Sequence, residues 1–254
     1  MPQKICVHLQ GEPPLNPFKH ASGLRALVYG WLGQSSQSVA ASVHDANQPK
    51  PFAISPLGAN LPHAGRCSFE VSVLTDWLLT PLLEGLSSGP SEITLGREEY
   101  AIAGWELARH VEWDSLLECA RRLASFRIEA LTPTAHHAQG VVRRSIVTPS
   151  PELYFGSWLN KWNLCCEHAI PAEMTELVAA YLAVSAFSGG TEVVQLGRDR
   201  TFIGFTGKVK FSLLTSDELP FDAIRYLQAL ARFADFCGTG VDTSRGMGQT
   251  AFLE

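Results

Sequence analysis

The sequence predicts an α+β protein made of two consecutive units, each with the order strand, helix, strand, strand, helix, strand. Some short segments alternate apolar and polar residues, as strands with one buried face do, and other segments repeat apolar residues at helical spacing. The same order of segments recurs in residues 1–122 and 123–254. The two halves share no obvious sequence repeat, so the predicted duplication rests on element order alone.

In the N-terminal half, the first strand is expected over residues 4–10, where Ile5, Val7 and Leu9 alternate with polar residues. Ser22 is expected to cap a helix that runs to about Leu32, and a polar loop should follow it. The remaining segments predict strands over 51–57 and 67–74, a helix over 76–86, and one or two strands over 93–107.

The C-terminal half is expected to begin near residue 123, where the segment 116–122 ends and a new strand follows. Its expected elements are a strand over 126–132, helices over 151–162 and 172–186, strands over 193–196 and 201–214, a helix over 221–236, and a last strand over 250–253. Each half then has the split βαβ, or ferredoxin-like, arrangement, so two tandem ferredoxin-like domains are predicted.

Neither half of the chain carries a net positive charge. The formal net charge is −5, with 9 Lys+Arg against 12 Asp+Glu in residues 1–122 and 11 against 13 in residues 123–254. Binding to nucleic acid would therefore need a local basic patch. The candidates are short groups that could equally be solvated surface charges: Arg121–Arg122, Arg143–Arg144, and Lys208 with Lys210.

Cysteine usage and hydropathy indicate a cytoplasmic protein. The longest apolar run, residues 177–187, is too short to cross a bilayer, and the first residues lack the apolar core of a signal peptide. The six cysteines form no C-x-x-C pair, so free thiols are expected. Cys165, Cys166 and His168 lie close together but lack ligand-pair spacing, and we expect neither a metal site nor a cofactor.

The most distinctive segment is residues 238–248, where four glycines follow the spacing G-x-G-x₅-G-x-G. The segment lacks the G-K-[ST] of a P-loop and follows a predicted helix, and Thr243 replaces the third glycine of a dinucleotide fingerprint. Glycine allows positive φ and close approach of another chain, and exposed N–H groups in such loops bind phosphates. The alternative interpretation is a long, tight turn between the last helix and the last strand.

A last helix, this glycine loop and a final strand are the signature of the repeat-associated mysterious protein (RAMP) superfamily. Within it, the chain resembles the CRISPR repeat-processing endoribonucleases through residues 24–32, the segment Lys50-Pro-Phe-Ala-Ile-Ser-Pro-Leu57, and Leu131-Thr-Pro-Thr134. The resemblance covers nearly the whole chain. It implies tandem ferredoxin-like domains that bind precursor CRISPR RNA in antiviral defense. It also implies metal-independent cleavage within each repeat, which leaves 2′,3′-cyclic phosphate and 5′-hydroxyl ends.

Cleaving RNA without a metal requires a base for the ribose 2′-OH, an acid for the leaving 5′-oxygen, and positive charge beside the phosphorane-like transition state. Tyr29, His44 and Lys50 have spacings of fifteen and six residues, similar to the tyrosine, histidine and lysine of family members with a three-residue site. The resemblance therefore implies that these three residues are catalytic. His44 is expected in a polar loop, where the side chain of Asp45 should seldom face it.

His20 is the rival histidine, because it precedes a helix N-terminus where a phosphate could be held. Contacts to RNA are expected from the following residues: Arg25, Arg143, Arg144, Gly238, Gly240, Arg245, Gly246 and Gly248. The expected partners are precursor and mature CRISPR RNA, and we also consider effector-complex subunits and a homodimer. Two other functions stay open, a non-catalytic RNA-binding subunit of an effector complex and a small-molecule enzyme that uses the loop as an anion site.

Overall fold

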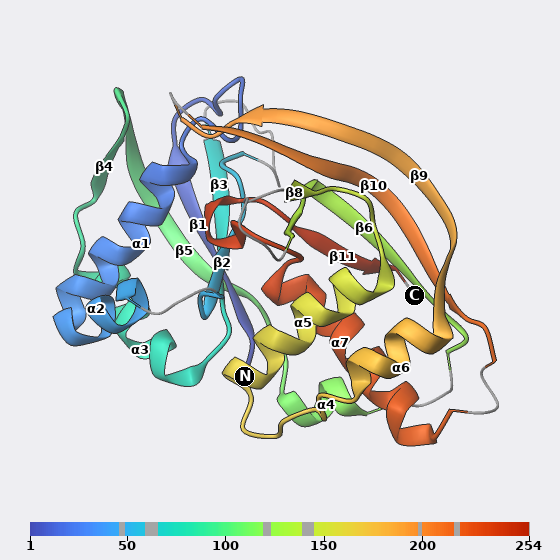
Figure 1. Ribbon diagram of the computed structural model, residues 1–254. Coiled ribbons are helices and arrows are strands. Elements are labelled where there is room, and N and C mark those ends of the chain that lie inside the picture. Colours follow the sequence, from blue (N-terminus) through green and yellow to red (C-terminus); the bar gives the residue numbers. More distant parts are fainter. Residues whose placement is uncertain are drawn as a thin grey trace. The chain divides into compact units, whose positions relative to one another are not determined.

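The computed structural model describes residues 1–45, 49–58, 66–118, 123–138, 145–197, 200–215 and 219–253. The chain divides into two compact units (Figure 1), and the first contains Met1–His110, Val194–Thr201 and Ser244–Gly246. The rest of the chain forms the second unit, including α4 (Trp113–Leu117), which precedes the predicted boundary near residue 122. None of the helices within the described ranges combines the length and apolar character that a bilayer crossing requires.

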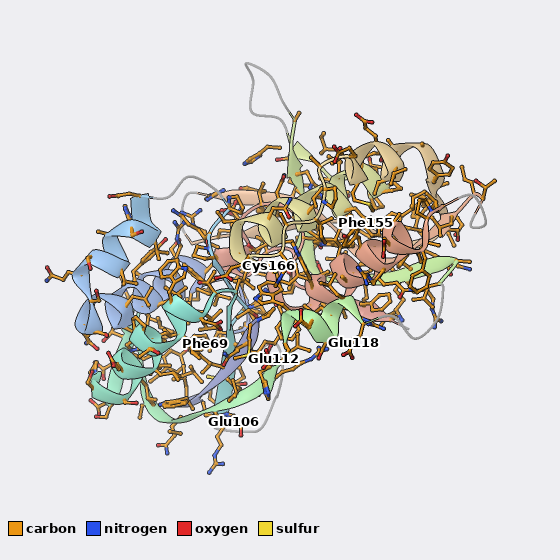
Figure 2. All side chains as sticks on the ribbon, turned by 90° about the horizontal axis from the view of Figure 1, so that it is seen from below. Phe69, Glu106, Glu112, Glu118, Phe155 and Cys166 are labelled. Carbon is orange, nitrogen blue, oxygen red and sulfur yellow. The ribbon has the colours of Figure 1, made fainter. Side chains whose placement is uncertain are left out.

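The N-terminal unit contains a five-stranded sheet with the order β2-β3-β1-β5-β4, and every register given for it is antiparallel. Phe69 on β3 and Glu106 on β5 are labelled in Figure 2. The elements are β1 (Gln3–Gln10), α1 (Ala21–Ser35), α2 (Gln37–Asp45), β2 (Phe52–Ile54), β3 (Arg66–Val73), α3 (Asp76–Ser88), β4 (Glu92–Leu95) and β5 (Glu98–His110).

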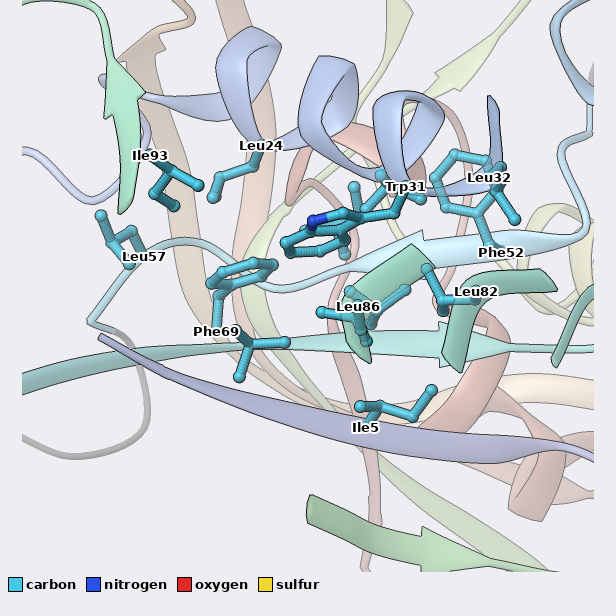
Figure 3. Close-up of a cluster of buried hydrophobic side chains, with 14 of the residues drawn as sticks. Ile5, Leu24, Trp31, Leu32, Phe52, Leu57, Phe69, Leu82, Leu86 and Ile93 are labelled. Carbon is cyan, nitrogen blue, oxygen red and sulfur yellow. The ribbon is translucent and has the colours of Figure 1, made fainter. Parts of the chain in front are cut away.

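The core of this unit lies between α1 and the sheet. Ile5 on β1 is fully buried, as the alternating pattern predicted, and Leu24 and Trp31 of α1 are each only 1% exposed. Figure 3 shows these side chains in one cluster with Phe69, and the ring of Phe69 stacks on that of Trp31 with centroids 6.2 Å apart. Burial of such large apolar side chains contributes roughly 1.5–3 kcal/mol each, which fixes α1 on the sheet.

Two details of the N-terminal prediction are wrong. The helix begins at Ala21 with His20 at the N-cap, so Ser22 is not the cap, and it continues through Gly33 to Ser35. The polar loop expected around His44 is instead the helix α2. Its apolar residues are few, but Val43 is only 1% exposed and joins the core, and that contact outweighs the polar composition.

The C-terminal unit contains a four-stranded sheet with the order β11-β6-β10-β9 and a small pair, β7 with β8. Phe155 of α5 packs edge-to-face against Phe126 on the sheet, with ring centroids 5.6 Å apart. The elements are β6 (Ser125–Thr134), β7 (His136–His137), β8 (Ser145–Ile146), α5 (Pro151–Cys165), α6 (Met174–Tyr181), β9 (Leu182–Gln195), β10 (Thr201–Leu213), α7 (Phe221–Cys237), η1 (Thr243–Arg245) and β11 (Thr250–Leu253).

The two units share one topology. In each sheet the second strand of the motif pairs with the third, the third with the first, and the first with the fourth; β4 is an added edge in the N-terminal unit. This confirms the predicted α+β fold of two tandem ferredoxin-like domains.

The predicted helix over residues 172–186 is wrong in its second half. The helix α6 ends at Tyr181, and residues from Leu182 onward belong to β9. A short apolar run such as 182–186 is compatible with a helix or a strand. The choice is made by pairing with β10, where the Ser185 hydroxyl lies 2.7 Å from that of Ser212.

Candidate active site

The three residues predicted to be catalytic lie together in the N-terminal unit, where α1, α2 and the start of β2 meet. The rings of Tyr29 and His44 form an edge-to-face pair with centroids 5.5 Å apart. The Lys50 ammonium donates hydrogen bonds of 2.8 Å to the backbone carbonyls of Val43 and His44. The structure therefore brings together residues that are spread over 22 positions of the chain.

Lys50 holds the C-terminal end of α2. Its side chain is only 5% exposed, and its positive charge is placed against the last carbonyls of the helix, where a cation is most stabilising. Burial lowers the pKa of Lys50 below its usual value, the nearby Arg25 guanidinium lowers it further, and Asp45 acts in the opposite direction. A change at Lys50 would thus alter the position of His44 as well as the local charge.

Tyr29 is fixed on both sides of its ring. Arg25, one turn earlier on α1, places its guanidinium 5.5 Å from the ring centroid and donates to the hydroxyl at 3.4 Å. The ring of Phe52 on β2 makes a second edge-to-face contact at 5.7 Å. The phenol group is therefore oriented beside His44 with a permanent positive charge next to it.

His44 is the exposed member of the group. Its side chain is 71% exposed, and its Nδ1 lies 3.2 Å from a carboxylate oxygen of Asp45. The expectation that Asp45 would not face His44 is wrong, because the two residues end a helix rather than lie in an extended loop. An accessible imidazole oriented by a carboxylate can give or take a proton near neutral pH.

His20, the rival histidine, is held in a different environment. It is 3% exposed, and its Nε2 lies 2.6 Å from a carboxylate oxygen of Glu98. Tyr100 donates to the same oxygen at 3.1 Å, and Lys19 pairs with the other one. These hydrogen bonds, from Lys19 first and then His20, lower the pKa of Glu98 to about 2. The anion that His20 contacts in the structure is thus a carboxylate of its own chain.

The glycine-rich loop between α7 and β11 is a tightly packed turn. Gly240 has φ of 76°, and a Cβ atom at this position would lie 2.1 Å from the carbonyl oxygen of Ala135. Gly248 has φ of 64°, and its Cβ would lie 1.9 Å from the carbonyl oxygen of Thr239. Both positions require glycine for conformation and for space, as the sequence predicted.

The expectation that the N–H groups of this loop are exposed is wrong for much of it. They are donated to oxygen atoms of the chain itself: Thr239 to Gly248, Gly240 to the Ser157 hydroxyl, Val241 to Ala135, Met247 to Asp242, and Gly248 to Pro133. These bonds make the loop a stable connection between α7 and β11. Contact of the loop with RNA remains a prediction, and it would depend more on side chains such as Arg245 than on these amides.

Sequence reasoning missed Lys161. This residue lies on α5, is 2% exposed, and donates hydrogen bonds of 3.0 and 2.9 Å to the carbonyls of Cys237 and Gly238. Burial lowers its pKa. The ammonium thus holds the end of α7 where the glycine loop starts, as Lys50 holds the end of α2. A lysine between Leu159 and Trp162, in the predicted helix over 151–162, was the available signal.

The other predicted sites have different outcomes. Arg143 and Arg144 lie outside the described residues. Lys208 on β10 is 3.9 Å from a carboxylate oxygen of Glu129 on the neighbouring strand. Within the described ranges, Cys165, Cys166 and His168 do not bring three ligand atoms together.

Comparisons with known proteins identify the family of this chain. A sequence model of the family CRISPR-associated endoribonuclease Cas6 matches residues 128–250. A solved Cas6 product complex is 30% identical, with a TM-score of 0.85 over 100% of this chain and 99% of that one. Thermus thermophilus Cas6 is 29% identical, with a TM-score of 0.75 over 100% and 98%. The chain belongs to the Cas6 family. The family predicted from the sequence is thereby confirmed.

A curated relative, the CRISPR-associated endoribonuclease Cas6 of Mycobacterium tuberculosis, is 30% identical over 156 residues. That alignment covers 58% of this chain and 46% of the relative, so the chain spans about half the length of the curated Cas6 it matches. The family match over residues 128–250 includes the glycine loop and excludes Tyr29, His44 and Lys50. The catalytic roles of these three residues therefore remain a prediction, which the resemblance implied and this match does not test.

Proposed function

We propose that this chain binds precursor CRISPR RNA and cleaves it within each repeat at the group formed by Tyr29, His44 and Lys50. The observation that carries the proposal is the exposed His44 imidazole, packed against Tyr29 and held in place through its own backbone by Lys50. Membership of a family described as CRISPR-associated endoribonucleases supports the reaction and the substrate class.

In the proposed reaction, the ribose 2′-oxygen attacks the adjacent phosphorus while the bond from phosphorus to the 5′-oxygen breaks. The proton of the 2′-OH leaves to a base, and the 5′-oxygen receives a proton from an acid. His44 carries one of these proton transfers, and the Tyr29 hydroxyl orients the reacting ribose. The products are a 2′,3′-cyclic phosphate and a 5′-hydroxyl.

Two cations lie next to the proposed reaction centre. The Arg25 guanidinium contacts Tyr29, and the Lys50 ammonium contacts the backbone of His44. Their positive charge favours the transition state, which carries more negative charge on the phosphorane oxygens than the ground state does on the phosphate. In this proposal His44 supplies one proton transfer, solvent water supplies the other, and Arg25 and Lys50 supply the positive charge, so the cleavage requires no metal ion.

The test uses the repeat RNA of the source genome's own array, incubated with the full chain in the presence of a chelator. We expect one cut per repeat, with a cyclic phosphate upstream and a 5′-hydroxyl downstream. A single 2′-deoxy nucleotide before the cut should abolish cleavage and leave binding intact, because it removes the nucleophile. Normal cleavage of the deoxy substrate would exclude the mechanism. Tight binding without cleavage of the all-ribose RNA would instead favour a non-catalytic RNA-binding subunit.

A further inference from the structure

A second group of chemically reactive side chains lies on the N-terminal sheet, away from the proposed cleavage site. It consists of Cys6 and His8 on β1 and Glu106 on β5, and one ligand atom from each residue lies within 4.8 Å of the others. The Cys6 sulfur is 4.0 Å from Nδ1 of His8, and Nε2 of His8 is 3.3 Å from a carboxylate oxygen of Glu106. Figure 2 labels Glu106 on the N-terminal sheet.

Strand register brings these residues together. Cys6 is paired directly with Glu106 across the antiparallel strands, and His8 follows Cys6 by two residues, so its side chain lies on the same face. The alternate residues Ile5 and Val7 are fully buried in the core that α1 covers. The Cys6, His8 and Glu106 group therefore occupies the opposite face of the sheet from α1, which carries Tyr29.

We propose that Cys6, His8 and Glu106 bind a zinc ion, with water completing the coordination. Thiolate, imidazole and carboxylate are the ligand types that zinc accepts, and three protein ligands plus water is a common zinc coordination. The Glu106 side chain is 66% exposed and that of His8 37%, so solvent reaches one side of the group. Nδ1 of His8 faces Cys6 and Nε2 faces Glu106, so the imidazole ring must rotate before one nitrogen can share an ion with both partners.

The surroundings of the group favour a cation. Ser68, opposite His8 on β3, is 2% exposed, and its hydroxyl has no hydrogen-bond partner among the residues the structure describes. Glu70 adds negative charge beside Cys6. The Lys4 ammonium, 3.2 Å from a carboxylate oxygen of Glu70, partly balances this charge. A bound metal would compensate this charge and stabilise the thiolate.

The experiment titrates the metal-free full chain with Co²⁺, whose absorption reports thiolate ligation and tetrahedral geometry, and then displaces it with Zn²⁺. We expect one ion per chain, with a thiolate charge-transfer band that disappears in Cys6→Ser. His8→Gln and Glu106→Gln should weaken zinc binding by more than about 100-fold, and Ser68→Ala by about tenfold, as expected for a residue that supports a ligand. Zinc should raise the unfolding temperature of the wild type and leave that of Cys6→Ser unchanged.

The matched control is Cys67→Ser, which removes a thiol that is 3% exposed in the core on the next strand. This variant should keep the cobalt spectrum and the zinc affinity of the wild type. The proposal is overturned if Cys6→Ser and His8→Gln, both folded by circular dichroism, bind zinc as tightly as the wild type. The same applies if the cobalt complex shows no thiolate band. Cleavage of repeat RNA is a separate measurement, so either proposal can fail without the other.

Discussion

The two regions that the sequence singled out, the α1–α2 site and the glycine loop at 238–248, use their polar groups in opposite ways. In the loop, the amides of Thr239, Gly240 and Gly248 are all donated to oxygen atoms of the same chain. At the α1–α2 site, the His44 side chain is 71% exposed. The unusual sequence of the loop thus serves an unusual backbone conformation. Catalysis, by contrast, requires functional groups that stay accessible in the folded protein, as at the α1–α2 site.

The same contrast separates the two histidines of the N-terminal unit. His20 is buried with its imidazole at 2.6 Å from Glu98, whereas His44 ends an exposed helix and is held mainly through backbone contacts from Lys50. Buried, hydrogen-bonded groups contribute to stability, and accessible ones can meet a substrate. The following predictions test this division, beginning with the largest effect.

Replacing His44 should affect chemistry most. General acid–base catalysis typically contributes about 10²–10⁴-fold, so His44→Ala should slow single-turnover cleavage at saturating enzyme by that factor, with RNA affinity nearly unchanged. His20→Ala is the matched control, and it should lower the free energy of unfolding, because it removes a buried side chain that contacts Glu98. A folded His20→Ala without cleavage, beside an active His44→Ala, would reverse the assignment.

Gly240→Val should damage the fold of the C-terminal unit. Its side chain would require positive φ and would meet the carbonyl oxygen of Ala135 at 2.1 Å, so we expect a loss of about 3 kcal/mol or more in the free energy of unfolding. Chemical denaturation measures this loss. Gly190→Val on β9 is the control, because nothing lies within 4 Å of its Cβ position, and it should unfold nearly as the wild type does. Equal stability of the two variants would contradict the view of the loop as a strained, packed turn.

Lys50→Met should have a moderate effect that separates positioning from proton transfer. Loss of the two hydrogen bonds to Val43 and His44 should loosen the end of α2 and slow cleavage by about tenfold, a value typical for loss of a hydrogen bond to a charged group. The shape of the pH–rate profile should stay the same. A changed alkaline limb would show that Lys50 itself transfers a proton. Lys19→Met, which removes a surface ion pair with Glu98, should cleave at the wild-type rate.

Arg245→Ala should have the smallest effect. If the loop contributes one phosphate contact through this side chain, affinity should fall several-fold, and the slope of log affinity against log salt should flatten by about one. The cleavage rate at saturating enzyme should not change. Binding measured at several salt concentrations tests this. An unchanged slope would indicate that Arg245 does not contact RNA and that the loop acts only as a connection.

The sequence by itself determined the repeated element order, the buried face of the first strand, and the residue types of the candidate site. Each of these features depends on a short stretch of sequence. An apolar repeat of 2 or 3.6 residues shows which side chains can share one face of a strand or a helix. The glycine loop was recognisable for the same reason, since four glycines stand within eleven positions. The spacing of Tyr29, His44 and Lys50 was likewise a local property of the chain.

The tertiary structure decided what these segments contact. Residues 37–45 form a helix because Val43 reaches the core, and residues from Leu182 form a strand because β10 pairs with them. His20 meets Glu98 across 78 positions, and His8 meets Glu106 across 98. Such contacts depend on strand register and on helix packing against the sheet. No local pattern encodes them, because register and packing arise only when distant segments compete to bury their apolar faces together.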